Sequence, residues 1–225
     1  MFATLIALAL AAPAFPPAET RLMLTGYDRI RVDGPFTVRV MAEPSATNRI
    51  VGEPAAIATV QVRVEGQTLV VVPARDDRGR PIAATGAAPV IELRSDRLAA
   101  VALRGAGRIE VERTTAARVD LALTGDGMIR IGSLDSGSVQ ATLIGAGTMT
   151  LAGKSGQGRF TINGPGTIDA DALTIDALQV RSEGSGGGRY RARYTADVTA
   201  TGAGAVTVAG SPQCRTRGTA TIRCG

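Results

Sequence analysis

The chain has 225 residues, of which 44% are hydrophobic, 20% charged and 3% aromatic, so it is long enough to bury a sizeable core. Histidine is absent and there are 2 cysteines, which excludes imidazole general bases, histidine-rich metal sites, and Ser-His-Asp or Cys-His nucleophile systems. The net charge of +5 would suit a nucleic acid, but the basic residues are dispersed among Asp and Glu and few aromatics are present to stack bases, so we expect no nucleic-acid partner.

The N-terminus predicts a secretion signal. Residues Phe2 to Ala12 form an apolar run that is shorter than the roughly 20 residues needed to cross a bilayer. Ala12, Pro13 and Ala14 supply the small-x-small pattern of a signal-peptidase site, so we expect cleavage after Ala14. The predicted signal peptide therefore spans residues 1–14. We expect the mature protein in the periplasm or outside the cell, without a transmembrane segment.

Residues 20–98 form a predicted N-terminal β segment. Within it, Tyr27–Val40 and Val60–Val72 alternate between apolar and polar residues, which is typical of strands with one buried face. Gly34 and Gly66 lie near the centres of these two stretches. The sequence therefore predicts two hairpin-like strand pairs that begin and cap the fold.

The next part of the chain contains six G-x-G triplets at spacings of 18 to 20 residues. The triplets begin at Gly105, Gly125, Gly145, Gly164, Gly184 and Gly202. Apolar and polar residues alternate on both sides of each triplet, so each repeat predicts two short strands joined by the G-x-G bend and followed by a second bend. A unit of about twenty residues cannot bury its apolar face alone, so successive copies must stack.

These repeats predict an all-β fold, a right-handed parallel β-helix or β-solenoid, with the N-terminal hairpins as its cap. We place the repeats at residues 99–210 of a single domain that spans residues 20–225. Glycine on both sides of each bend tolerates positive φ and lets neighbouring coils approach closely, whereas the variable middle residue is expected to point outward. We expect Leu123 to be buried between Leu103 and Leu143.

Cys214 and Cys224 follow the last triplet. In an oxidising compartment they have no competing partner, so we expect a disulfide between them. The bridge would close residues 211–225 into a cap that covers the last coil and protects its edge. Two thiols without C-x-x-C spacing are too few for a metal site and do not favour a redox site. We expect neither a metal nor another cofactor.

Polar residues at equivalent positions of successive repeats predict ladders along the fold. The first ladder holds the residues five positions after the first glycine of each triplet, which are Glu110, Arg130, Thr150, Asp169, Arg189 and Thr207. The second holds the residues five positions before it, which are Ala100, Asp120, Gln140, Arg159, Gln179 and Asp197. The charged residues of the first ladder are candidate ligand-binding residues for a regularly spaced polysaccharide or an envelope protein: Glu110, Arg130, Asp169 and Arg189. The alternative is that these charges pair with one another for solubility.

Two further patterns resemble active sites but lack the required context. Asp169, Asp171 and Asp176 lie close in sequence and could supply the carboxylates of a glycosidase. No group shows the paired, desolvated setting that tunes a catalytic pKa. The stretch Gly153-Lys154-Ser155 resembles the end of a P-loop, but the glycine that the motif requires is absent and strand patterns lie on both sides. We therefore expect that the protein is not an enzyme.

Several segments in order resemble the head GIN domain family, described as auto-transporter adhesins of bacterial envelopes. They are YDRIRVDGPFTVRV, EGQTLVV, RLAAVALRGAG, the recurring G-x-G units and AGSPQC, between Tyr27 and Cys224. The resemblance implies a secreted β-solenoid-like domain without an established catalytic activity. We therefore expect an exported binding or adhesion domain of the cell envelope. The alternatives are a polysaccharide-acting β-helix enzyme with surface carboxylates, and a structural or signalling periplasmic protein.

Overall fold

Long strands that begin and end at G-x-G bends make up most of the fold. The computed structural model describes residues 18–83 and 87–225, and the predicted signal peptide, residues 1–14, lies outside them. Five long strands occupy the repeats: β9 (Arg108–Thr124), β10 (Met128–Ile144), β11 (Thr148–Asn163), β12 (Thr167–Glu183) and β13 (Gly187–Thr201).

Shorter elements flank the repeats at both ends. The N-terminal elements are β1 (Ala18–Arg21), β2 (Arg29–Asp33), β3 (Thr37–Met41), β4 (Arg49–Gly52), the short helix α1 (Pro54–Ile57), β5 (Val60–Glu65), β6 (Thr68–Pro73), β7 (Val90–Arg94) and β8 (Ala100–Arg104). The C-terminal elements are β14 (Ala205–Gly210), β15 (Gln213–Gly218) and β16 (Thr221–Cys224).

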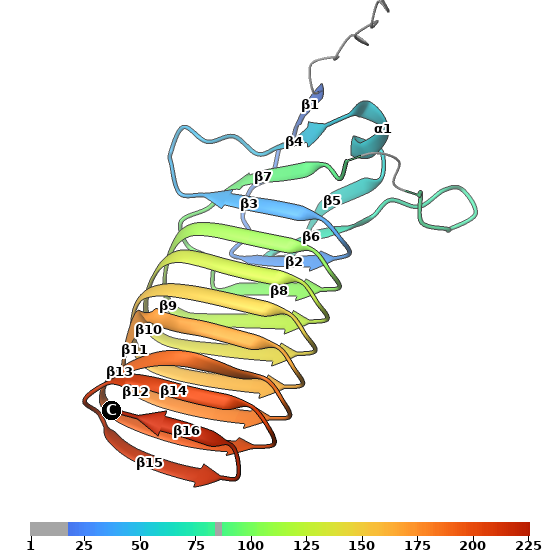
Figure 1. The fold of residues 1–225 in the computed structure, drawn as a ribbon. Coiled ribbons are helices and arrows are strands. Elements are labelled where there is room, and N and C mark those ends of the chain that lie inside the picture. The colour runs from blue at the N-terminus through green and yellow to red at the C-terminus, as the bar shows by residue number, and fades with distance from the viewer. Residues whose placement is uncertain (1–17, 84–86) are drawn as a thin grey trace, which may run out of the picture.

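Successive long strands pair in parallel and in chain order, from β9 to β13. Figure 1 shows the resulting stack of coils, which runs from the N-terminal elements to β15 and β16. We use the word coil for one turn of this stack. The prediction of an all-β solenoid built from parallel G-x-G repeats is confirmed.

Each coil is one bent strand, whereas the alternation predicts two short ones. In β9 the first part buries Ile109 and Val111, and the last part buries Val119, Leu121 and Leu123. The backbone between these parts remains paired with the next coil, from the register pair Arg113 and Ser133 onward. The second bend therefore does not interrupt the ladder, because the chain turns there while its hydrogen bonds to neighbouring coils persist.

The first and last parts of the coils form two walls with the core between them. We call the outer surface of the first parts, with β3, β7, β14 and β16, face 1. The outer surface of the last parts, with β2, β8 and β15, is face 2. In Figure 1 the G-x-G bends that join these walls line up along the right-hand edge of the stack.

The two glycines of each triplet have different roles in the bend. The first adopts positive φ, which is 112° at Gly125 and 113° at Gly145. The second is buried in every triplet, and the middle residue is exposed in every triplet. The bends also bond to one another, since the amide of Gly147 donates to the carbonyl of Gly125 at 2.9 Å. The predicted roles of the flanking glycines and of the middle residue are confirmed.

The first predicted hairpin, Tyr27–Val40, is wrong. Strands β2 and β3 do not pair with each other: β2 pairs in parallel with β6 and β8, and β3 pairs in parallel with β7 and β9. Gly34 has a φ of 126°, and its carbonyl oxygen lies 2.6 Å from the position a Cβ of Gly107 would occupy. The segment therefore forms a further coil bend. The prediction failed because a hairpin and a coil bend show the same alternation around a glycine.

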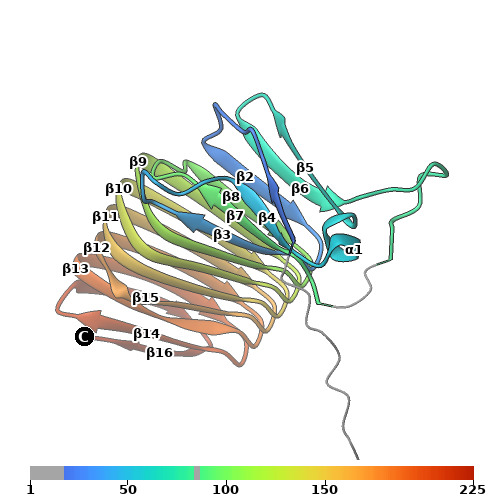
Figure 2. The same cartoon turned by 90° about the horizontal axis from the view of Figure 1, so that it is seen from above.

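The second predicted hairpin forms and caps face 2. Strands β5 and β6 pair antiparallel around Gly66, whose φ is 62°. On the face 1 side, β4 pairs antiparallel with both β1 and β7, and β7 pairs in parallel with β3. Figure 2 shows both groups at the N-terminal end of the stack. The exposed side chains of Arg63 and Glu65 form a 2.6 Å ion pair on β5, and such charges discourage edge-to-edge pairing with another chain.

Inward side chains stack in columns along the core. Leu123 is fully buried and is the register partner of Leu103 on one side and of Leu143 on the other. The predicted environment of Leu123 is confirmed. The same arrangement places Phe160 on Ala141, so that a large side chain lies beside a small one.

Tyr190 explains why one repeat matches the pattern poorly. Its ring is fully buried and lies 5.0 Å from the ring centroid of Phe160. Most other repeats hold a β-branched residue or a methionine at the position of Gly188, but here a Cβ would come within 2.7 Å of the Tyr190 Oη. Gly188 therefore makes the space that Tyr190 fills.

Replacing Tyr190 by phenylalanine is expected to stabilise the protein by about 1 kcal/mol. The buried Oη has no hydrogen-bond partner among the described residues, and burial raises the pKa of this phenol above its usual range. The substitution removes an unsatisfied polar atom and keeps the ring. Urea unfolding of the two proteins measures the difference. A loss of stability would mean that the hydroxyl of Tyr190 forms a hydrogen bond in the folded protein.

The C-terminal residues form the last coil themselves, whereas the sequence predicts that they lie over it. Strand β15 pairs in parallel with β13, and β16 pairs in parallel with β14. The predicted disulfide between Cys214 and Cys224 is confirmed, with a Cα–Cα distance of 6.3 Å. Because Cys214 is in register with Ala196 and Cys224 with Val208, both cysteines occupy inward positions, and the bridge joins the two walls at the open end of the core.

Reduction of the disulfide is expected to loosen the last coil before the repeats unfold. All six residues of β15 are exposed, so this strand has little packing to hold it. The chain-entropy model limits the loss to about 2 to 3 kcal/mol for a short loop. Hydrogen exchange should rise in residues 206–225 and stay slow in residues 103–168. A uniform rise along all coils would contradict this order.

Candidate functional site

The first predicted ladder is a straight line of side chains on face 1. Arg130 is in register with Glu110 on one side and Thr150 on the other, and Asp169 is in register with Thr150 and Arg189. The structure therefore brings the four predicted ligand-binding residues into one column. The column continues toward the N-terminus through three register partners, which are Arg39, Glu92 and Arg49.

Most charges of this column pair with one another. Arg39 and Arg108 each lie 3.5 Å from a carboxylate oxygen of Glu110, and Arg189 lies 2.5 Å from Asp169. The hydrogen bond to Asp169 raises the pKa of Arg189 above its ordinary value. A ligand on face 1 would have to compete with these ion pairs. The alternative that the sequence leaves open, pairing along the ladder, is thus seen at Glu110, Asp169 and Arg189.

Face 2 carries a groove that runs along the stack. Its two polar columns lie two residues apart on the same strands, with an inward residue between them. The inner column contains Arg118, Ser138, Gln157, Ala177, Thr195 and Gln213, and the outer column contains Asp120, Gln140, Arg159, Gln179, Asp197 and Arg215. The outer column extends the second predicted ladder.

Three depressions that share lining residues make the groove continuous. The first has a volume of 320 Å³ over β9 to β12, and it shares Ala177 and Gln179 with a second of 400 Å³ that reaches β15. The third, of 320 Å³, lies toward the G-x-G bends and shares Arg159 with the first. The groove therefore crosses at least four coils, and most of its polar side chains are hydroxyls, amides and guanidinium groups, with the carboxylate of Asp197 among them.

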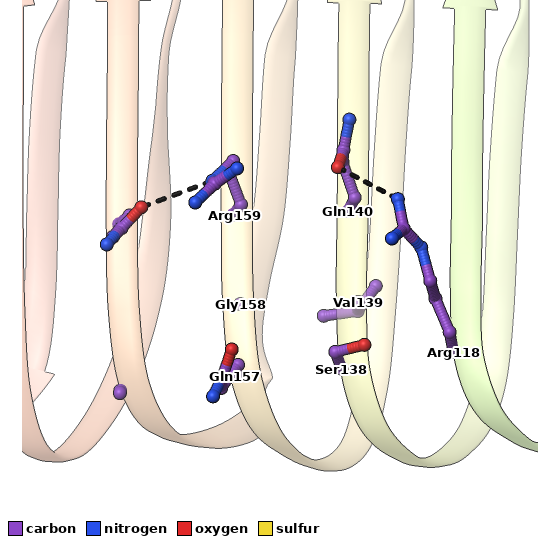
Figure 3. Close-up of a pocket in the computed structure, with 9 residues that line it drawn as sticks. Arg118, Ser138, Val139, Gln140, Gln157, Gly158 and Arg159 are labelled. Carbon is purple, nitrogen blue, oxygen red and sulfur yellow. Dashed lines mark hydrogen bonds between the residues drawn. The ribbon is translucent and has the colours of Figure 1, made fainter.

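Hydrogen bonds between neighbouring coils hold two arginines of the groove, Arg118 and Arg159. Arg118 contacts Asp120 at 3.0 Å and donates to Gln140 at 3.3 Å. The Nε of Arg159 donates to the amide oxygen of Gln179 at 3.1 Å. Figure 3 shows these two bonds spanning adjacent strands. The groove thus has an ordered wall of polar groups before any ligand arrives.

The inner column of the groove was not predicted from the sequence. Residues such as Ser138 and Gln157 differ from coil to coil, so no repeated letter marks their positions. A signal was nevertheless present, because four of the six glutamines of the chain fall five or seven positions before a bend: Gln140, Gln157, Gln179 and Gln213. Both offsets place a side chain on the outer surface of the same strand.

The three aspartates considered for catalysis all form ion pairs with arginines. Each is bound by a different arginine: Asp169 by Arg189, Asp171 by Arg191 at 3.1 Å and Asp176 by Arg193 at 3.2 Å. All three ion pairs join β12 to β13.

The stretch that resembles a P-loop is part of a strand. Gly153, Lys154 and Ser155 lie within β11, and Lys154 pairs with Asp135 of the neighbouring coil at 3.1 Å. Among the described residues, no three side chains of His, Cys, Asp or Glu gather as a metal site would require. In the same residues, no helix has the length and apolar character needed to cross a membrane.

Comparisons with known proteins agree with this architecture. Residues 26–212 match the family described as "Putative auto-transporter adhesin, head GIN domain". A comparison with curated proteins finds no match.

Solved structures share the fold over nearly the whole chain. A putative adhesin from Bacteroides fragilis NCTC 9343 superposes with a TM-score of 0.81 at 21% identity, covering 95% of this chain and 99% of the other. A putative lipid binding protein from Parabacteroides distasonis ATCC 8503 has a TM-score of 0.69 at 17% identity, with coverages of 93% and 97%. At these identities the likeness shows the fold alone. Because the family match spans most of the chain and includes all six G-x-G bends, the protein belongs to the head GIN domain family.

Proposed function

We propose that this protein is an exported, non-catalytic binding domain of the cell envelope that holds an extended polysaccharide along the groove of face 2. One observation carries the proposal: polar side chains repeat at coil spacing along a groove that crosses at least four coils. The adhesin-type family supports a binding role, and the disulfide supports export to the periplasm or beyond.

The spacing of the groove suits a polymer. Neighbouring coils lie about 4.8 Å apart, which is comparable with the length of one sugar unit in an extended chain. Glutamine amides both donate and accept hydrogen bonds, as sugar hydroxyls do. Gln157 and Gln140 lie on adjacent coils, one in each column, so a sugar chain could bond to both columns as it crosses successive coils.

Face 2 is favoured over face 1 because more of its polar side chains are free to bind a ligand. On face 1, Glu110 already has two arginine partners and Asp169 has one. On face 2, Gln157 and Gln213 make no side-chain hydrogen bond within the described residues. The face 1 column, with Glu110, Arg130, Asp169 and Arg189, remains the second candidate surface.

A lipid, the ligand named for one structural relative, fits this groove less well. The exposed large apolar side chains of the described residues are scattered, and none lines the groove: Met23, Ile82, Ile144 and Tyr194. A lipid tail would find no continuous apolar surface there.

Retention on immobilised glycans tests the proposal. The purified chain should be retained by at least one bacterial or plant polysaccharide, without release of new reducing ends. Cleavage would contradict the non-catalytic role and favour the enzyme alternative. Failure to bind any polysaccharide would overturn the proposed ligand and leave a protein partner as the better explanation.

Paired variants locate the binding surface. Replacing Gln157 and Gln213 together by alanine removes two groove amides that make no side-chain hydrogen bond among the described residues, so affinity should fall about tenfold or more, as the loss of one or two hydrogen bonds predicts. The matched control, Glu110→Gln with Asp169→Asn, changes face 1 and should leave affinity unchanged. The opposite result would place the site on face 1.

A further inference from the structure

We infer that the polysaccharide of the groove is acidic and that the guanidinium of Arg159 binds its anionic groups. The inference rests on the proposed function, because it specifies the ligand of the same groove. It follows from three observations: the charges that line the groove, the unusual surroundings of Arg159, and the geometry in which this guanidinium is held.

The lining of the groove is rich in positive charge. Four arginines line the three depressions and one carboxylate does, that of Asp197: the arginines are Arg118, Arg159, Arg181 and Arg215. Asp120 of the outer column pairs with Arg118, and Glu183 pairs with Arg181, so Arg159 and Arg215 are the lining arginines without an ion pair among the described residues. These two guanidinium groups are available to anions, whereas most charges of the face 1 column are paired.

Arg159 lies between two neutral neighbours. Its register partners in the outer column are Gln140 on one side and Gln179 on the other. Among the described residues it makes no ion pair, and its one side-chain bond is the 3.1 Å contact from Nε to Gln179. The charge of Arg159 is thus not neutralised by the surrounding protein.

The bond to Gln179 also orients Arg159. A guanidinium carries five N–H donors in a planar fork, and this bond uses the one on Nε. The two terminal nitrogens remain available for the two oxygens of a carboxylate or sulfate, which is the bidentate geometry that arginine favours. Figure 3 shows Arg159 beside Gln157 and across from Gln140, so amides that could bond to sugar hydroxyls surround the charged group.

Further arginines lie at coil spacing from Arg159 along the groove. Arg118 is two coils away through Ser138 and Gln157, or about 10 Å. Arg215 is three coils away through Gln179 and Asp197, or about 14 Å. A polymer with an acidic group on every second or third sugar could therefore meet more than one guanidinium.

Arg159→Gln is the matched test, because glutamine already occupies the same column on both adjacent coils. Its control is Arg113→Gln, which removes the same charge at an exposed position outside the groove. Both variants should melt within a few degrees of the parent protein. Binding is measured to polygalacturonate, alginate and heparin as acidic polymers and to dextran and galactan as neutral ones.

The parent protein should retain at least one acidic polymer, release it as salt rises, and bind the neutral polymers at least tenfold more weakly. Arg159→Gln should weaken the acidic complex at least tenfold, while Arg113→Gln changes it less than twofold. Equal weakening by both variants would mean general attraction to the net charge and would overturn the inference.

The remaining outcomes separate this inference from the proposed function. Binding of neutral and acidic polymers with equal affinity would overturn the inference and leave the proposed function intact. Failure to bind any of the polymers would contradict both. Single-stranded DNA that binds as tightly as the acidic polysaccharides, with the same sensitivity to Arg159→Gln, would overturn the assignment to a polysaccharide.

Discussion

Replacing Leu123 by alanine is expected to lower the free energy of unfolding by about 2 to 5 kcal/mol, the range for large-to-small changes in a packed core. The side chain is fully buried and stacked between Leu103 and Leu143, and these neighbours belong to a backbone ladder that cannot collapse into the cavity. Guanidinium chloride titration measures the loss.

Thr124 supplies the control for Leu123, because it is the next residue and its side chain is exposed. Thr124→Ala should change the free energy of unfolding by less than about 0.5 kcal/mol. Equal losses in the two variants would contradict the inward and outward assignment of this strand.

Replacing Gly127 by alanine is expected to cost about 3 kcal/mol, at the upper end of the usual range for overpacking. An added Cβ would lie 2.7 Å from the carbonyl oxygen of Gly107 and 2.9 Å from that of Gly105. Both oxygens belong to the backbone of the preceding coil, so the clash with the added Cβ is removed only if the whole bend shifts. Thermal unfolding measures the effect.

Asp126 is the matched control for Gly127, since it is the exposed middle residue of the same triplet. Asp126→Ala should shift the midpoint by a degree or two at most, as is usual for surface substitutions. If Gly127→Ala were equally mild, close stacking of the bends would not be the reason for the second glycine.

The coil repeat could be predicted from the sequence because two independent patterns agree. Alternation marks which side chains point inward, and the G-x-G triplets mark where neighbouring backbones meet. The same patterns misassigned Tyr27–Val40, because alternation around Gly34 does not reveal whether the flanking strands pair with each other or with other coils. That choice depends on contacts with β8 and β9, which are distant in sequence.

The C-terminal coil and the groove were harder to predict for different reasons. Strand β15 contains few apolar residues because one of its sides has no further coil to pack against, so it lacks the alternation that marks a coil strand. The groove depends on differences in side-chain length across several strands, where the long side chains of Arg118 and Arg159 lie beside the short ones of Ser138 and Ala177. Such differences form a groove only when the coils are placed in register.

The side-chain amides offer the most direct test of the claim that face 2 is the binding surface. The chain has six glutamines and two asparagines, so their NH₂ resonances are few enough to assign in a ¹⁵N-labelled sample. On titration with soluble fragments of an acidic polysaccharide that the protein retains, resonances of Gln140, Gln157 and Gln179 should shift, while Gln61 and Gln67 of the N-terminal hairpin should not. Binding that leaves the three groove glutamines unshifted would contradict the account.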